Sequence, residues 1–142
     1  LTKVSSVFFD TAPIIYYIEA HPQFGPLSKE AVKAFQSGTF TAYFSVITLS
    51  EVLAKPYELG KESLARTFAD FLLRGRNFRL VEISREIAQR AGRLRGKYPA
   101  LKVLDSIQVA SALSIRAEAF LTNDGKLKQV REIKVLVLKD YL

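Results

Sequence analysis

Short apolar runs alternate with longer amphipathic stretches along this chain, and the alternation limits the folds that it can adopt. The runs are rich in aromatic and β-branched side chains, which favour strands, and they span residues 4–9, 41–46, 78–83, 119–122 and 134–138. Strands that alternate with helices favour a parallel sheet with helices on both faces. We therefore expect an α/β fold, a three-layer α/β/α sandwich around a central, mostly parallel sheet.

The stretches between these runs have helical patterns. We expect a helix from about residue 13 to 21, then helices over 27–37, 62–73 and 85–97, and a turn or short helix over 124–129. A short helix over 48–53 should break before Pro56, because proline cannot donate a hydrogen bond inside a helix. Residues 103–117 are apolar on nearly every side, which indicates a buried helix.

The composition excludes several kinds of functional site. The 142 residues include no cysteine and a single histidine, His21, which excludes disulfides, thiolate nucleophiles, iron–sulfur clusters and any site that needs two histidines. No apolar run reaches the ~20 residues that span a bilayer. The length suits one domain, so we expect a single domain over residues 1–142, with no secretory signal and no membrane association, in the cytoplasm.

The chain is basic, with 21 lysines and arginines against 14 aspartates and glutamates and a formal net charge of +7. This excess favours an anionic partner, and nucleic acid before a membrane surface. Arg90, Arg93 and Lys97 share one face of the helix expected over 85–97, so they are candidates for phosphate contacts. A solvated helix face explains them equally well, and we do not assign them to the site.

Four carboxylates are expected at one edge of the sheet. Asp10 and Asp124 follow the first and fourth apolar runs, and open parallel sheets bind ligands beyond the carboxyl ends of their strands. Glu51 and Asp105 lie near the starts of two helices. Taken singly, Asp10 suits a helix cap, Asp124 suits a turn, and Glu51 suits a capping box with Thr48. Asp105 is harder to explain in this way, because its helix is apolar.

Carboxylates that share one crevice repel each other, and a protein tolerates them when cations are present. Oxygen ligands without sulfur or paired histidines select Mg²⁺ or Mn²⁺. Acidic metal ligands in a basic chain suit metal-dependent cleavage of a nucleic acid, in which ions activate water beside the scissile phosphate. We expect Asp10 and Asp105 to bind one divalent ion, with Glu51 and Asp124 completing the cluster directly or through water.

Four segments are similar, in order and spacing, to the motifs of a known family. They are residues 7–11 (VFFDT), 48–52 (TLSEV), 104–113 (LDSIQVASAL) and 120–124 (FLTND). With these motifs the chain resembles the PIN-domain ribonucleases, and especially the VapC-like toxins of bacterial toxin–antitoxin systems, over nearly its whole length. It departs from the usual motifs at Ser106, where alanine is frequent, and at Leu127, where an aromatic residue is frequent; neither position is a metal ligand.

The resemblance implies the identity of the site residues. The family's Mg²⁺- or Mn²⁺-binding acidic residues would correspond to Asp10, Glu51, Asp105 and Asp124. Around them, the side chains that could orient a ligand or water are Thr11, Ser50, Thr122 and Asn123. The resemblance also implies endoribonuclease activity on single-stranded RNA, a homodimer, and a cognate antitoxin protein that covers the site. Apolar side chains among Ile14, Tyr17 and residues 62–73 could form the groove for such a partner.

Other functions fit the sequence less well. An aspartate-nucleophile phosphatase usually needs a second aspartate two residues after the first, and that position is Ala12. A receiver domain needs an acidic pair near the end of the first strand and a lysine late in the chain, and the serines at positions 5 and 6 supply no such pair. A catalytically silent PIN-like module that binds RNA or a peptide stays the alternative to the enzyme. His21, which precedes a proline, is interpreted as a cap rather than a catalyst.

Overall fold

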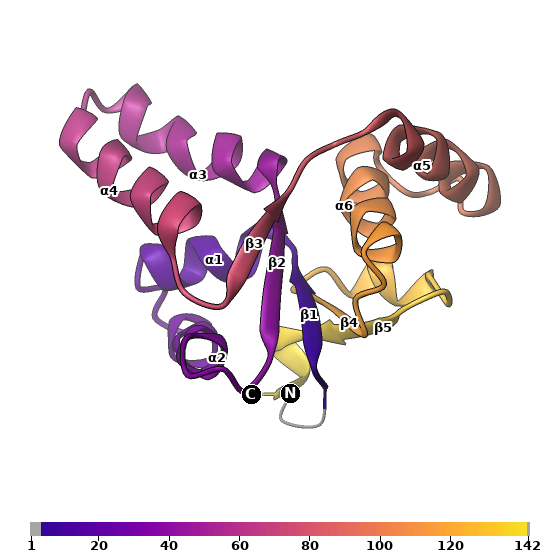
Figure 1. The fold of residues 1–142 in the computed structure, drawn as a ribbon, viewed down its shortest axis with the longest axis horizontal. Helices are drawn as coiled ribbons and strands as arrows, with labels where there is room; N and C mark the ends of the chain where they lie inside the picture. Colours follow the sequence, from indigo (N-terminus) through magenta and orange to yellow (C-terminus); the bar gives the residue numbers. More distant parts are fainter. Residues whose placement is uncertain (1–3, 142) are drawn as a thin grey trace.

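The computed structural model describes residues 4–141 as alternating strands and helices (Figure 1). The elements are, in chain order, β1 (Ser6–Phe9), α1 (Thr11–Ile18), α2 (Gly25–Gln36), β2 (Thr41–Ser45), α3 (Val46–Glu58), α4 (Glu62–Arg74), β3 (Phe78–Val81), α5 (Arg85–Lys97), α6 (Val103–Ser114), β4 (Ala119–Thr122), the 3-10 helix η1 (Gly125–Gln129), β5 (Lys134–Val137) and the 3-10 helix η2 (Leu138–Tyr141).

The strands form one sheet in the order β3-β2-β1-β4-β5, and every neighbouring pair is parallel. The first strand is the central one: Phe8 pairs with Tyr43 of β2 on one side and with Phe120 of β4 on the other. The expected parallel sheet is therefore confirmed.

Helices cover both faces of this sheet and complete the three expected layers (Figure 1). Successive side chains of a strand point to opposite faces, so β1 sends Val7 and Phe9 to one face and Phe8 to the other. Val7 and Phe9 pack in a core with residues of α1 to α4, whereas Phe8 packs in a second core with α5 and α6. Both cores form because the strand is apolar on both of its faces.

The direction of the strand connections reverses at β1. The chain moves from β1 to β2 and β3 on one side, then crosses β1 to place β4 and β5 on the other. Ligands of open parallel sheets bind at such a switch point, outside the carboxyl ends of the strands. Here the crevice lies between the ends of β1 and β4, where the Asp10 N–H donates a hydrogen bond to the Leu121 carbonyl at 2.8 Å.

Helix α3 differs from its prediction at both ends. It begins at Val46, because the Ser45 hydroxyl accepts a hydrogen bond from the Ile47 N–H and caps the helix. It also continues through Pro56 to Glu58. Proline removes one helical hydrogen bond, and here it lies in the last turn and is buried, where packing offsets that loss. The predictions of a start at Thr48 and a break before Pro56 were therefore wrong.

The end of α6 has a specific cause. The helix stops at Ser114 rather than at residue 117, because Arg116 adopts a left-handed conformation with φ of 57°. The Arg116 N–H then donates to the Leu113 carbonyl and the Ala117 N–H donates to the Ala112 carbonyl, at 3.1 and 3.0 Å. This pair of bonds is a Schellman motif, which returns the chain toward β4.

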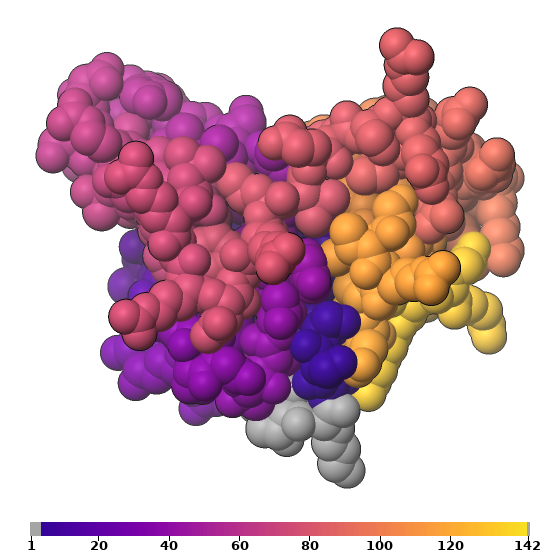
Figure 2. Space-filling view, in the orientation of Figure 1, coloured from indigo at the N-terminus to yellow at the C-terminus, as the bar shows by residue number. Residues whose placement is uncertain are grey.

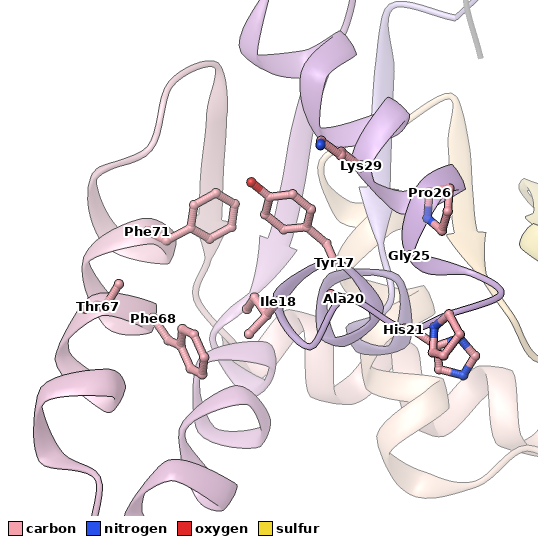
Figure 3. Close-up of a pocket in the computed structure, with 11 residues that line it drawn as sticks. Tyr17, Ile18, Ala20, His21, Gly25, Pro26, Lys29, Thr67, Phe68 and Phe71 are labelled. Atoms are coloured by element: carbon pink, nitrogen blue, oxygen red, sulfur yellow. The ribbon is translucent and has the colours of Figure 1, made fainter.

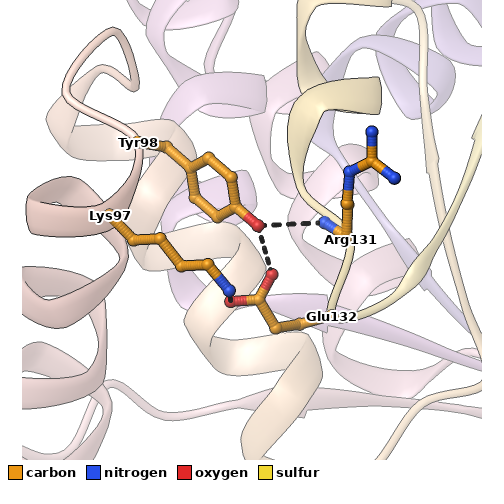
Figure 4. A network of polar contacts seen from close by, with 4 residues as sticks. All are labelled: Lys97, Tyr98, Arg131 and Glu132. Carbon is orange, nitrogen blue, oxygen red and sulfur yellow. Dashed lines mark hydrogen bonds and ion pairs between the residues drawn. The ribbon is translucent and has the colours of Figure 1, made fainter.

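A polar network ties the end of α5 to the segment before β5 (Figure 4). The Tyr98 hydroxyl donates to Glu132 and accepts a hydrogen bond from the Arg131 N–H, while the Lys97 ammonium also contacts Glu132. Lys97 is thus engaged in an ion pair, whereas Arg93, exposed on the same helix, forms none with the residues that the structure describes.

Within residues 4–141, no helix has the length and apolar character needed to cross a membrane.

Candidate functional site

The carboxylates expected at the sheet edge come from four elements. Asp10 follows β1 and caps α1, Asp124 follows β4 and precedes η1, Asp105 lies in the first turn of α6, and Glu51 lies on α3. At this end of the sheet the surface is notched between the lobe of α3 and α4 and the lobe of α5 (Figure 2). The structure therefore brings the four acidic residues to one end of the molecule.

A cavity of about 460 Å³ opens at this edge. Three of the acidic residues line it, Asp10, Glu51 and Asp105, and its other walls are Thr11, Ala12, Ile15, Lys102, Val103, Leu104 and Gln108. Asp124 is not part of the lining. It is linked to the cavity through Thr122, whose hydroxyl oxygen accepts a hydrogen bond from the Asp124 N–H at 3.1 Å.

Asp10 is held at the centre of the crevice by two hydrogen bonds. Its Oδ1 accepts from the Thr11 N–H at 2.9 Å and its Oδ2 accepts from the Thr122 hydroxyl at 2.8 Å. Burial raises the pKa of Asp10 to about 6, against the two hydrogen bonds, and the charges of Asp105 and Glu51 raise it further. The protein therefore holds this carboxylate rigidly in a place where its negative charge is costly.

Asp105 has a similar electrostatic environment. Desolvation raises its pKa, the charge of Asp124 raises it next, and Glu51 adds to this effect, while Lys102 acts in the opposite direction. Among residues 4–141, the ion pairs are Asp70 with Arg74, Glu132 with Lys97 and Asp140 with Lys128, so none involves an acidic residue of the crevice. A cation bound from outside the chain would lower the electrostatic cost of ionising both Asp10 and Asp105.

The donor set fits a hard divalent cation that keeps part of its water shell. All candidate ligand atoms are carboxylate oxygens, which Mg²⁺ and Mn²⁺ prefer. In the part of the chain that the structure describes, however, no three acidic or histidine side chains are grouped closely enough to hold an ion by themselves. Mg²⁺ usually takes one or two protein carboxylates and completes its shell with water and substrate phosphate, so its binding does not require a group of three.

The Thr11 hydroxyl connects three elements beneath the cavity. It lies 2.7 Å from Glu51 Oε1, 2.8 Å from the Thr48 hydroxyl and 3.3 Å from Gln108 Nε2. Glu51 is exposed on α3, and this contact fixes its carboxylate toward α1. The capping-box interpretation of Glu51 and Thr48 was wrong, because Ser45 caps α3 and Thr48 is a buried partner of Thr11.

The four orienting residues expected from the sequence have different surroundings. Thr11 contacts Glu51 and Thr122 contacts Asp10. The Asn123 amide instead donates to the Tyr16 hydroxyl at 3.2 Å and accepts from the Lys139 N–H at 2.9 Å, so it joins α1 to η2. Ser50 is exposed one residue before Glu51.

Sequence reasoning missed three residues of the site, Thr48, Lys102 and Gln108. Gln108 follows Asp105 by three positions, which places both on one face of α6. A glutamine inside an otherwise apolar helix was the available signal, and it went unused. Lys102 precedes α6 and lies next to Asp105 at the cavity wall.

His21 and the apolar groove lie outside this cavity. His21 Nδ1 accepts hydrogen bonds from the N–H groups of Gln23 and Phe24, at 3.2 and 3.1 Å, so the residue caps the loop before α2 as expected. Beside it, an open cavity of about 810 Å³ lies between α1, α2 and α4, and Tyr17, Phe68 and Phe71 face it (Figure 3). Ile14, by contrast, is fully buried and takes no part in this groove.

The four motifs lie within a region of the chain that matches a known protein family. The PIN domain family model matches residues 7–133. A protein of a toxin–antitoxin complex from Klebsiella pneumoniae has 26% identity and a TM-score of 0.69, with 93% of this chain and 97% of that chain covered. No match was found among curated protein sequences.

Two further solved structures share the fold at lower identity. A chain of VapBC2 from Rickettsia felis, bound to promoter DNA, has 18% identity and a TM-score of 0.75, covering 93% of this chain and 98% of that one. VapC20 of Mycobacterium tuberculosis, a toxin that cleaves the sarcin–ricin loop, has 14% identity and a TM-score of 0.67, covering 87% and 93%. Because the family model spans nearly all of the chain and the crevice lies where its motifs converge, this protein belongs to the PIN-domain family.

Proposed function

We propose that this PIN-domain protein is a divalent-metal-dependent endoribonuclease that hydrolyses RNA phosphodiester bonds as the toxin of a toxin–antitoxin pair. One observation carries the proposal: the Asp10 carboxylate is buried at the switch point beside Asp105 and Glu51, without a basic partner among residues 4–141. A protein that only binds RNA has no need for this concentration of negative charge, which repels a phosphate backbone.

The roles of the residues follow from their positions. Asp10 and Asp105 would hold Mg²⁺ or Mn²⁺, with Glu51 and Asp124 bound directly or through water, and the ion would supply positive charge at the scissile phosphate and activate the attacking water. The Thr122 hydroxyl holds Asp10 Oδ2 in place. Lys102 stands at the cavity wall and offers a cation to a phosphate group.

A cleavage assay tests this proposal. A structured RNA should be cut in the presence of Mg²⁺ or Mn²⁺ and should stay intact in EDTA. Asp10→Asn should lower the cleavage rate by about 100-fold or more, since changes to groups that only orient ligands already cost 10–100-fold.

Asp70→Asn is the matched control, because Asp70 is an exposed aspartate on α4 that pairs with Arg74. It should leave the rate unchanged. Cleavage that persists both in EDTA and in Asp10→Asn would end the proposal, and a protein that takes up no Mn²⁺ at millimolar concentration would favour the catalytically silent module instead.

A second part of the proposal is the antitoxin partner. An apolar cavity of about 480 Å³ between α1, α3 and α4 is lined by Ile15, Ile18, Leu59, Leu64 and Phe68. It shares Ile15 and Glu51 with the acidic cavity, and Ile18 and Phe68 with the groove of Figure 3. A peptide seated along this surface would end beside Glu51, so one partner could cover the site. The homodimer, the cytoplasmic location and the single domain over residues 1–142 stay part of this proposal.

A further inference from the structure

Gln108 is a buried polar residue with an incomplete set of partners. It is 2% exposed on α6, and its Nε2 donates to the Thr11 hydroxyl at 3.3 Å. Its Oε1 is buried and finds no hydrogen-bond partner among residues 4–141. A buried acceptor without a partner destabilises the fold, so an apolar residue of similar volume would suit the fold better.

Three hydrogen bonds meet at the Thr11 hydroxyl, and their directions depend on one another. A hydroxyl has one proton to donate and two lone pairs that accept. An ionised Glu51 carboxylate only accepts, so Thr11 donates its proton to Glu51 Oε1. Thr11 then has none left for Thr48, and both Thr48 and the Gln108 amide must donate to Thr11.

The amide orientation of Gln108 follows from the same argument. With its amide turned over, Gln108 would present Oε1 to Thr11, and the single Thr11 proton would face two acceptors, Gln108 and Glu51. The orientation with Nε2 toward Thr11 leaves each contact with one donor and one acceptor. It also keeps Thr11 from turning its proton away from Glu51.

We propose that Gln108 is a positioning residue, which acts through Thr11 to hold the Glu51 carboxylate at the cavity. Glu51 is exposed on α3, and an exposed glutamate loses side-chain entropy when it is fixed. The bond from Thr11 offsets this cost, and Gln108 from the opposite layer of the fold keeps that bond aligned. The inference rests on the proposed function, since it concerns a carboxylate proposed to serve a divalent ion.

The variant Gln108→Leu removes both the donor and the unpaired acceptor. We expect the unfolding temperature of the metal-free protein to stay the same or rise, whereas its affinity for Mn²⁺, measured by calorimetry, should fall by about 10-fold. Gln108→Met removes the same groups with a flexible side chain, and it serves if the leucine variant folds poorly. Opposite changes in stability and in affinity separate positioning from a general structural role.

Two further variants sharpen the test. Gln108→His keeps an N–H at about the same distance from the backbone, so it should keep the contact to Thr11; because an imidazole in this cavity can itself bind Mn²⁺, this variant is compared in the metal-free protein. Ser111→Ala removes another buried polar group of α6, whose hydroxyl donates only to the Ile107 carbonyl of its own helix, and it should leave the affinity unchanged.

A readout without metal keeps this inference separate from the nuclease proposal. In the metal-free protein, the hydroxyl proton of Thr11 should exchange slowly enough to give an NMR signal in the wild type and in Gln108→His, and the signal should be lost in Gln108→Leu. An unchanged signal together with wild-type Mn²⁺ affinity in Gln108→Leu overturns the inference. A wild-type protein that binds Mn²⁺ but leaves RNA intact overturns the nuclease proposal alone.

Discussion

Among single side chains, Asp10 shows most clearly how stability and function conflict in this protein. The carboxylate caps α1 and accepts two hydrogen bonds, yet burial still raises its pKa to about 6. The folded protein therefore binds a proton at Asp10 more tightly than the unfolded chain does, in which the value is 3.8. Ionising Asp10 near neutral pH consequently destabilises the metal-free fold.

The pH dependence of stability tests this account. The stabilising contribution of Asp10 is complete below about pH 3.8 and is lost as the pH rises through about 6, because a raised pKa favours the protonated folded state. The difference between the two pKa values of Asp10, 3.8 in the unfolded chain and about 6 in the fold, corresponds to about 3 kcal/mol of unfolding free energy at pH 8. Asp10→Asn should therefore be more stable than the wild type at pH 8 in EDTA. The gain should be smaller than this free energy, because the asparagine also loses a hydrogen bond.

Urea denaturation at several pH values measures this difference. The gap between Asp10→Asn and the wild type should shrink as the pH is lowered from 8 to 4. A gap that does not change with pH would show that burial of the charge is not its cause.

Among the helices and strands, the sequence predicted the type of every α-helix and strand but not all of their limits, and it did not predict the 3-10 helix η2, whose first residue was placed in the last strand. Helix α5 has the bounds expected from its periodicity, because its apolar and charged faces are separate. Helix α3 does not, since Ser45 and Thr48 are both suitable capping residues and only the packing of Thr48 against Thr11 decides between them. Contacts between distant segments leave no mark in a local pattern.

The same distinction applies to the site. The positions of Asp10 and Asp124 follow from the ends of strands, which the apolar runs reveal. Gln108 lies in the middle of a buried helix, where a local pattern cannot tell a packed polar residue from one that touches another layer. The three-dimensional contact with Thr11 was needed to find it.

Glycines at two elements give a matched prediction. A Cβ on Gly75, at the end of α4, would lie 1.8 Å from a ring atom of Phe78 and 2.8 Å from the Phe71 carbonyl oxygen. Gly92, inside α5, has nothing within 4 Å of that position. Gly75→Ala should lower the unfolding free energy by about 1–3 kcal/mol through overpacking, while Gly92→Ala should raise it by about 0.5–1 kcal/mol.

Thermal or urea unfolding of the two alanine variants checks this pair. The opposite signs are the essential result, because both variants make the same chemical change. Destabilisation of similar size in both would mean that α5 needs Gly92 for a reason other than space.

Charge is unevenly distributed over the molecule. The net charge of +7 coexists with four carboxylates at one end of the sheet. Of the three basic residues of α5 that are candidates for phosphate contacts, Lys97 is paired with Glu132, which leaves Arg90 and Arg93. Helix α5 lies at the end of the sheet where the strands terminate, whereas α2 lies toward their beginnings (Figure 1).

The apolar surface on α4 leads to a prediction about binding of the proposed partner. Leu64 is 40% exposed and lines the cavity beside Glu51, whereas Leu73, 57% exposed on the same helix, lies outside it. Leu64→Glu should weaken binding of the antitoxin proposed above by about 30-fold or more, as expected for an anchor residue, and Leu73→Glu should not. Titration of the purified pair measures both affinities, and equal losses would assign the partner to another surface.

The central place of β1 also has a consequence for protein synthesis. Its residues pair with β4, so Phe8 meets Phe120 only after all the residues between them have been made. Asp124 leaves the ribosome 114 residues after Asp10, a delay of roughly 6–23 seconds at common elongation rates of about 5–20 residues per second. A nascent chain that has not yet reached residue 124, or one that terminates before it, therefore lacks the assembled crevice, and the acidic cluster arises only after Asp124 has been made.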